Sequence, residues 1–476
     1  MARTVAGLPR GVRVSDHVTL GVLTTTVPAS LIDAVLADTE RESVRHRSLP
    51  ARLVVYYVMA LALYGQASYG EVLRCLLEGV RWLHPRGAAL ALATKSSITK
   101  ARRRLGPAPM AELYRRVARP LATPDLPGCF FRGRRLVSLD GTTIDLSDAP
   151  DVEARFGRPA ASRGASAFPQ MRVLALAETG THAVFAAAFD RCAVGETTLA
   201  GRLLDQLKPG MLCLADRAFV SFELWQAARA TGADLLWRLR ANQVLACETA
   251  LPDGSYLSRL YASPKHRRHR DGGVLVRVID YRLDSVPGAE PLYRLATTLL
   301  DPDDAPATEL ATLYHERWEA EGIFAEIKVT LPGGRLMLRS RRADLAEQEM
   351  FGLLLVHFAL RRLMVQASQA MGSNDAIDPD ELSFLHTVRV VRRHLPLHAA
   401  FSPSPAEPDG GDRAGRDPCR SRRPQSGAPQ PTRREAQDEQ LPDPQPGRAR
   451  RQKPVPVRGS HPDHGADRPG ATDAGL

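Results

Sequence analysis

The feature that most constrains the fold is an ordered series of short apolar runs and helical stretches that begins at Arg134. The order is three strands, a helix, a strand, a helix and a strand, which is typical of an α/β domain built on one sheet. We expect strands at Leu136–Leu139, Arg172–Ala177, Ala183–Phe189, Met211–Ala215 and Asp234–Arg240, and helices near Thr198–Leu207 and Phe222–Ala230.

Two aspartates directly follow strand-like runs. Asp140 ends LVSLD, and Asp216 ends MLCLAD. A single aspartate in such a place is usually a turn or cap residue. Because neighbouring strands of one sheet bring their carboxyl ends together, the two side chains could share a divalent metal that a later acidic helix closes. Asp145 and Asp148, in DLSDAPD, fit a turn better.

That acidic helix is predicted in LYHERWEAEGIFAEIK, where Tyr314, Arg317, Glu321 and Lys328 have the spacing Y-x2-R-x3-E-x6-K. At about 100° per helical residue, all four fall within roughly 60° on one face. A carboxylate beside two cations suits a metal that grips a phosphodiester, with Glu321 on the metal and Arg317 and Lys328 on phosphate. The alternative is an ordinary solvated helix with charge pairs. Glu326 falls on a different face, and we expect it in solvent.

Together these motifs resemble the DDE transposases of bacterial insertion sequences, specifically the insertion element four family. The resemblance is carried by LDGTTIDL, LADRAFVSFELW and the Y-x2-R-x3-E-x6-K stripe, and it spans roughly residues 18 to 395. It implies an α/β fold with a ribonuclease-H-like catalytic core, preceded by an all-α N-terminal domain. It also implies a β-rich insertion at about 241–306, where we expect strands at Val274–Leu283 and Leu292–Leu300.

The resemblance further implies an activity. Such a transposase binds the ends of its insertion sequence and catalyses DNA strand cleavage and strand transfer by two-metal phosphoryl transfer with two Mg2+ ions, for which Mn2+ can substitute. The catalytic metal ligands would be Asp140, Asp216 and Glu321, and the DNA-binding residues would include Tyr314, Arg317 and Lys328. The implied partners are terminal inverted repeats and target DNA, with a homodimer in the synaptic complex. The implied location is the bacterial cytoplasm, at the nucleoid.

The first 125 residues have helical periodicity. Pro50 opens the apolar stretch ARLVVYYVMALALY, and Ser68 and Glu71 have the spacing of a capping box. Further on, a Gly-Pro break separates two basic stretches, which allows a helix-turn-helix arrangement. The basic residues before the break would then contact DNA, and a solvated basic helix is the alternative. These residues are Lys100, Arg102, Arg103 and Arg104.

Composition agrees with a nucleic-acid partner. The 476 residues include 64 Lys and Arg against 53 Asp and Glu, and this net charge of +11 favours polyanions. The six cysteines form no C-x2-C pair, so we expect reduced thiols. No stretch has the order of a secretory signal, and the longest apolar run, Leu53–Tyr64, is too short to span a bilayer.

The C-terminal segment departs from the family pattern. Residues 401–476 contain 14 of the 36 prolines and few large apolar residues, so we expect them to be disordered. A one-nucleotide shift in permitted codons for QPTRREAQDEQLPD yields a basic segment typical of the family, and a frameshift is our hypothesis. The product could then be an inactive DNA-binding relic; a nuclease without joining activity is the other alternative. The predicted domains are 1–17 (flexible), 18–125 (DNA-binding), 130–395 (catalytic) and 396–476 (disordered).

Overall fold

A computed structural model describes most of the chain before residue 395. The described residues are 22–43, 49–79, 93–161, 164–165, 167–240, 242–283, 290–316, 319–369 and 378–394. The predicted flexible N-terminus, the predicted disordered tail, and Arg317 lie outside them. In the helix that follows Arg317, the backbone of Glu321 is described and its side chain is not. All described residues belong to one compact unit.

The N-terminal part is helical, as predicted. Its helices are α2 (Val22–Thr26), α3 (Ala29–Asp38), α4 (Ala51–Leu63), α5 (Tyr69–Gly79), α6 (Lys95–Leu105) and α7 (Ala108–Val117). Pro50 precedes α4, and every α4 residue from Leu53 to Leu63 is buried. Ser68 Oγ accepts a hydrogen bond from Glu71 N at 3.2 Å, which is one half of the predicted capping box. Gly106, at φ 70°, ends α6 and allows the chain to turn into α7.

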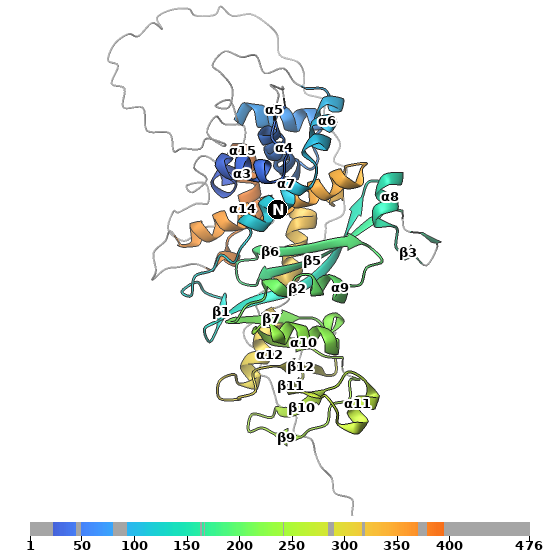
Figure 1. The fold of residues 1–476 in the computed structure, drawn as a ribbon. Coiled ribbons are helices and arrows are strands. Elements are labelled where there is room, and N and C mark those ends of the chain that lie inside the picture. Colours follow the sequence, from blue (N-terminus) through green and yellow to red (C-terminus); the bar gives the residue numbers. More distant parts are fainter. Residues whose placement is uncertain are drawn as a thin grey trace, which may run out of the picture. The chain divides into compact units, whose positions relative to one another are not determined.

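The catalytic core contains a five-stranded arrangement within one larger sheet. Its strands are β2 (Arg134–Leu146), β5 (Gln170–Glu178), β6 (Val184–Arg191), β7 (Met211–Ala215) and β8 (Asp234–Arg238). They lie in the order β6-β5-β2-β7-β8, and Figure 1 shows the first four side by side. β5 is antiparallel to β2 and β6, whereas β7 is parallel to β2 and β8. This order and these directions define a ribonuclease-H-like sheet, which confirms the predicted fold class.

The β-rich insertion extends the same sheet. It consists of β9 (Thr249–Ala250), β10 (Tyr256–Leu260), α11 (Pro264–His269), β11 (Val274–Tyr281) and β12 (Tyr293–Thr297). β12 pairs antiparallel with β8, and β11, β10 and β9 follow in order, so the insertion continues the core sheet. Shorter elements are β1 (Phe130–Phe131), α8 (Pro150–Phe156), β3 (Ala160–Ala161), β4 (Gly164–Ala165), η3 (Leu204–Gln206) and η4 (Arg217–Phe219).

Helices cover both faces of the sheet. α9 (Glu196–Gly201) and α10 (Phe222–Ala230) share one apolar cluster with β2 and β7. α12 (Ala307–Glu316) shares a second cluster with the other face of β7. A third cluster joins the N-terminal helices to the long helix α14 (Ala343–Gln369) and to the end of β2. α14 has the length and apolarity of a membrane span, but 83% of its most apolar window is buried inside the protein.

The segment between α12 and α14 carries the predicted catalytic helix. That helix is split, because the structure has α13 (Glu319–Ala325) followed by a π-helical turn, η5 (Glu326–Thr330). Leu331 N donates to Glu326 O at 2.7 Å, five residues back, as a π-helical turn requires. The remaining elements are β13 (Met337–Leu338), η6 (Pro379–Glu381) and α15 (Phe384–His394).

Candidate active site

Asp140 and Asp216 lie on neighbouring parallel strands. The last register pair between β2 and β7 is Leu139 with Ala215, and each aspartate is the next residue along the chain. Adjacent strands are about 4.8 Å apart, so the two residues are neighbours. Only β7 ends here. β2 continues to Leu146, so Asp140 lies within a strand and not at the strand end that the sequence predicts.

Both aspartates lie on the same face of the sheet. Leu212 and Leu214 of β7 pack beneath α12, and Asp216 continues that alternation. On β2, Asp140 lies on this face between Leu136, which packs beneath α12, and Ile144, which joins the cluster of α14. Each carboxylate Oδ1 accepts a hydrogen bond from the following backbone N–H, and both residues are partly exposed. The pair is therefore accessible and faces the predicted catalytic helix.

The helical segments that carry Tyr314, Glu321 and Lys328 pack against these strands. Tyr314 Oη on α12 donates to Ala215 O at 3.3 Å, next to Asp216. α13 contacts β2 directly. Lys328 Nζ on η5 donates to Thr142 Oγ1 at 3.1 Å, and Thr142 lies two residues beyond Asp140 on the same face. The structure thus brings the elements carrying Asp140, Asp216, Glu321 and Lys328 together.

Tyr314 has a different environment from the one expected for a DNA ligand. Its side chain is 2% exposed, and it lies in the apolar cluster beneath α12. In this structure its hydroxyl holds α12 against the end of β7. We therefore assign Tyr314 a role in positioning the helix.

The four predicted DNA-binding residues of α6 divide into two groups. Lys100, Arg103 and Arg104 are exposed. Arg102 is 2% exposed, and its guanidinium donates to Gln348 Oε1 at 2.8 Å and to Leu345 O at 2.9 Å. For Arg102 this corrects the expectation of a DNA contact, because the side chain joins α6 to α14 in the interior. The other three remain candidates for DNA binding.

Carboxylate oxygens are the ligands that Mg2+ and Mn2+ favour, so Asp140 and Asp216 fit a divalent metal. Among the side chains that the structure describes, no group of three His, Cys, Asp or Glu forms a metal cluster. The expected third ligand, Glu321, has a side chain outside that set. Behind Asp140, a Cβ on Gly141 would lie 3.1 Å from Glu196 Oε1 and 3.2 Å from Leu174 Cδ1, so a larger side chain would be crowded there.

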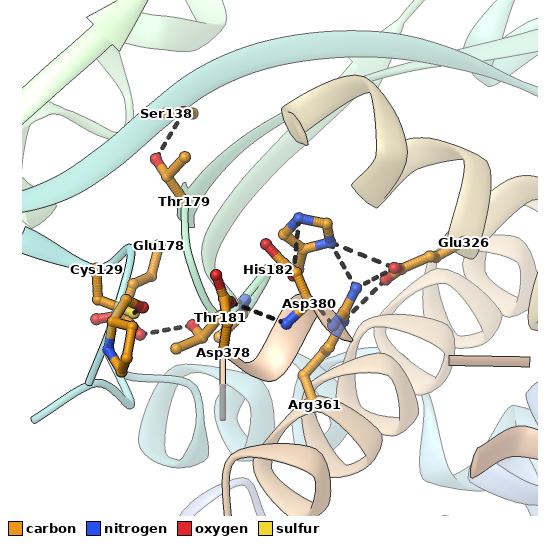
Figure 2. A network of polar contacts seen from close by, with 12 residues as sticks. Cys129, Ser138, Glu178, Thr179, Thr181, His182, Glu326, Arg361, Asp378 and Asp380 are labelled. Atoms are coloured by element: carbon orange, nitrogen blue, oxygen red, sulfur yellow. Dashed lines mark hydrogen bonds and ion pairs between the residues drawn. The ribbon is translucent and has the colours of Figure 1, made fainter. Parts of the chain in front are cut away.

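Glu326 was expected in solvent, and this expectation is wrong. Only 13% of its side chain is exposed. It lies among His182, His357 and Arg361, and Figure 2 shows its contacts with His182 and Arg361. Burial alone would raise the pKa of the Glu326 carboxyl, but the Arg361 charge and hydrogen bonds from both histidines hold that pKa well below its usual range. Helical periodicity missed this residue because its partners come from α14 and the β5–β6 turn, which no pattern around Glu326 reveals.

A ribonuclease-H-like sheet with two adjacent aspartates, packed against the helix that carries Glu321, agrees with the class of DDE transposases. Residues 17–115 match the N-terminal domain model of insertion element 4 transposases, and residues 131–359 match the transposase DDE domain. The chain belongs to the insertion element four family of DDE transposases. This confirms the resemblance seen in the sequence.

Two curated relatives and one solved structure are similar. The transposase InsG for insertion sequence element IS4 of Escherichia coli K12 is 28% identical over 380 residues, covering 78% of this chain and 82% of that protein. The putative transposase InsZ of the same organism is 26% identical over 223 residues, covering 47% of this chain and 72% of that protein. A piggyBac transposase synaptic complex with hairpin DNA matches at 10% identity and a TM-score of 0.39, covering 80% of this chain and 79% of that one.

Proposed function

We propose that this transposase binds the ends of its insertion sequence, cleaves DNA strands there and joins them to target DNA. The observation that carries the proposal is the adjacency of Asp140 and Asp216 on one sheet face, with α13 packed on β2. Glu321 lies on α13, and its carboxylate would complete the ligand set. The partners would be terminal inverted repeats and target DNA, with a homodimer in the synaptic complex, in the bacterial cytoplasm.

DDE domains generally use divalent metal ions, and the donor set here fits two Mg2+ ions, with Mn2+ as a substitute. Bound at Asp140, Asp216 and Glu321, the ions would activate water or a 3′-hydroxyl and stabilise the leaving oxygen. The side chains of the protein would hold the DNA in position for this reaction. Lys328 Nζ donates to Thr142 on the strand of Asp140, which supports a role for Lys328 in neutralising a phosphate near the carboxylates. We propose the same task for Arg317.

DNA outside the catalytic centre would contact the N-terminal helices. Lys100, Arg103 and Arg104 present exposed positive charge on α6, which supports a contact with phosphates there. Such contacts fix the register of the protein on the duplex and make affinity salt-dependent.

Substitution of the carboxylates tests the proposal. Asp140→Asn, Asp216→Asn and Glu321→Gln should each abolish cleavage of a supercoiled plasmid that carries the element ends. Binding to end DNA should change little, because the phosphate-contacting cations remain.

The matched control is Asp145→Asn. Asp145 lies on the same strand, but on the opposite face, where it pairs with Arg335 and accepts a hydrogen bond from Gln170 Nε2 at 2.8 Å. The control should cut at nearly the native rate. A native rate in any of the three test variants would remove that residue from the site, and cleavage without joined products in the native protein would favour a nuclease.

A further inference from the structure

A buried polar cluster lies on the side of the α13–η5 helix that faces α14. We define the Glu326 cluster as Glu326, His182, His357 and Arg361. Figure 2 shows Glu326, His182 and Arg361 of this cluster. Arg361 is 2% exposed, His357 0% and His182 7%. Glu326 is on η5, His357 and Arg361 are on α14, and His182 is in the turn between β5 and β6. The cluster therefore joins three parts of the chain that are distant in sequence.

Both carboxylate oxygens of Glu326 have partners in this cluster. Oε2 lies 3.0 Å from His357 Nε2 and accepts from Arg361 Nε at 3.0 Å. Oε1 lies 3.3 Å from His182 Nδ1 and accepts from the terminal nitrogen of Arg361. Contacts from two sides to both oxygens fix the rotation of the carboxylate and its position along the helix axis.

Stability alone does not account for such a cluster. Removing charges from water is costly, and well-packed apolar residues often stabilise a core as much or more. His182 adds a further cost, because its φ of 55° is in the left-handed region that a non-glycine residue rarely adopts. In some proteins, buried ionic groups of this kind specify one geometry at a cost in stability.

The geometry that the Glu326 cluster can specify is that of the catalytic helix. His182 packs close to Gly322, where a Cβ would lie 3.6 Å from its Cε1, and Gly322 follows Glu321 directly. Glu326 starts the π-helical turn, and Lys328, two residues later, reaches Thr142 on the opposite side. The helix is thus held from the α14 side by the cluster and from the β2 side by Lys328. π-Helical turns inside helices often occur at functional sites.

We propose that the Glu326 cluster is a positioning device, which fixes the helix that carries Glu321 and Lys328 beside the strands of Asp140 and Asp216. This inference rests on the proposed metal-dependent function. The four cluster residues do not touch the reacting atoms. They act through the helix, as the outer partners of metal ligands do in other enzymes, where their loss costs about 10–100-fold in metal affinity or activity.

The test compares Glu326→Gln with Glu349→Gln. Glu349 is a buried carboxylate on α14 that accepts from Ser340 Oγ at 2.7 Å, and Ser340 is also close to Arg102, on the α6 side of α14. Mn2+ binding would be followed by electron paramagnetic resonance on the protein bound to a pre-cleaved end duplex without target DNA. Glu326→Gln should weaken Mn2+ binding about tenfold or more. Glu349→Gln should leave it within about twofold, even if both variants unfold at lower temperature.

Two further measurements complete the test. DNA affinity in the absence of metal should stay within about twofold in Glu326→Gln, because the phosphate-contacting cations are unchanged. Arg361→Lys keeps the positive charge but loses the paired contacts, so it should show a smaller loss of Mn2+ affinity in the same direction. This milder variant serves if Glu326→Gln does not fold.

Asp140→Asn is the reference variant that separates a failure of the positioning proposal from a failure of the proposed metal site. If Asp140→Asn abolishes Mn2+ binding while Glu326→Gln and Arg361→Lys retain native affinity, the cluster has no positioning role. An equal loss in Glu349→Gln would reduce the effect to general destabilisation and also overturn the inference. If Asp140→Asn itself retains native Mn2+ affinity, the metal site is elsewhere, and both the proposed function and the inference fail.

Discussion

Arg102 and Arg103 are consecutive in sequence, but Arg102 is buried and Arg103 is exposed. Arg102 donates to Gln348 Oε1 at 2.8 Å, Leu345 O at 2.9 Å and Ser340 Oγ at 3.1 Å. Arg103 is exposed on the same helix. We predict that Arg102→Ala destabilises the protein with little direct effect on DNA, whereas Arg103→Ala weakens DNA binding with little effect on stability.

The expected loss of unfolding free energy in Arg102→Ala follows from the three hydrogen bonds that the Arg102 side chain donates. Hydrogen bonds from a charged donor contribute about 1.5–3 kcal/mol each, but their effects are not additive, and we expect a loss of about 3–5 kcal/mol. In a chain of this size each kcal/mol lowers the unfolding midpoint by roughly 1–2 °C, so the midpoint should fall by roughly 3–10 °C. Arg103→Ala should change stability by at most about 0.5 kcal/mol.

Two assays separate the variants. Thermal unfolding followed by circular dichroism measures the midpoint, and fluorescence anisotropy with end DNA at several salt concentrations measures the salt slope of affinity. Arg103→Ala should reduce that slope by about one unit, the effect of one lost phosphate contact. Arg102→Ala should leave the slope unchanged at a temperature where it is folded. An unchanged midpoint together with a reduced slope in Arg102→Ala would refute the structural assignment and restore the expectation from sequence.

Four further predictions concern the catalytic helix, the core and the tail. Lys328→Met should slow single-turnover cleavage strongly and lower the salt slope by about one unit. Tyr314→Phe, which loses the bond to Ala215 O, should cost about 1 kcal/mol of unfolding free energy and leave DNA affinity in anisotropy unchanged. Burial lowers the pKa of His357 below its usual 6.5, so only the unfolded chain gains that proton as pH falls. Stability should therefore decline below about pH 6.5, and His357→Gln should flatten that decline in pH-dependent melting curves. Deleting residues 401–476, poor in large apolar side chains, should leave the calorimetric midpoint unchanged; a large drop would contradict the composition argument.

The sequence predicted some core elements to the residue. β7 at Met211–Ala215 and α10 at Phe222–Ala230 match because each is a compact run with clear boundaries. β2 was predicted only as Leu136–Leu139, yet it extends to Leu146. Its second half contains a glycine and several polar residues, and it remains a strand because β5 pairs with it along its length. The local sequence pattern could not predict the second half of β2, because pairing with β5 stabilises it.

The residues of the candidate site also divide into those whose position the sequence predicts and those whose position it does not. The meeting of Asp140 and Asp216 was predictable, because each follows a strand-like run and parallel strands place such residues together. The interior roles of Arg102 and Glu326 were not, because their main partners, Gln348 and Arg361, belong to α14. A projection on an ideal helix also assumes a constant turn per residue, which the π-helical turn at Glu326–Thr330 does not obey. The roles of Arg317 and Glu321 remain predictions.

The pairing of β12 with β8 has a consequence for attempts to shorten this enzyme. In a bare five-stranded core, β8 would be an edge strand, and its residues Leu235, Leu236 and Trp237 are all fully buried. An uncovered apolar edge attracts strands from other molecules and promotes aggregation. β12 occupies that edge, with Thr297 opposite Leu236 and Ala296 opposite Trp237. The insertion therefore shields an apolar edge of the core sheet, and we expect a variant that lacks β12 to aggregate.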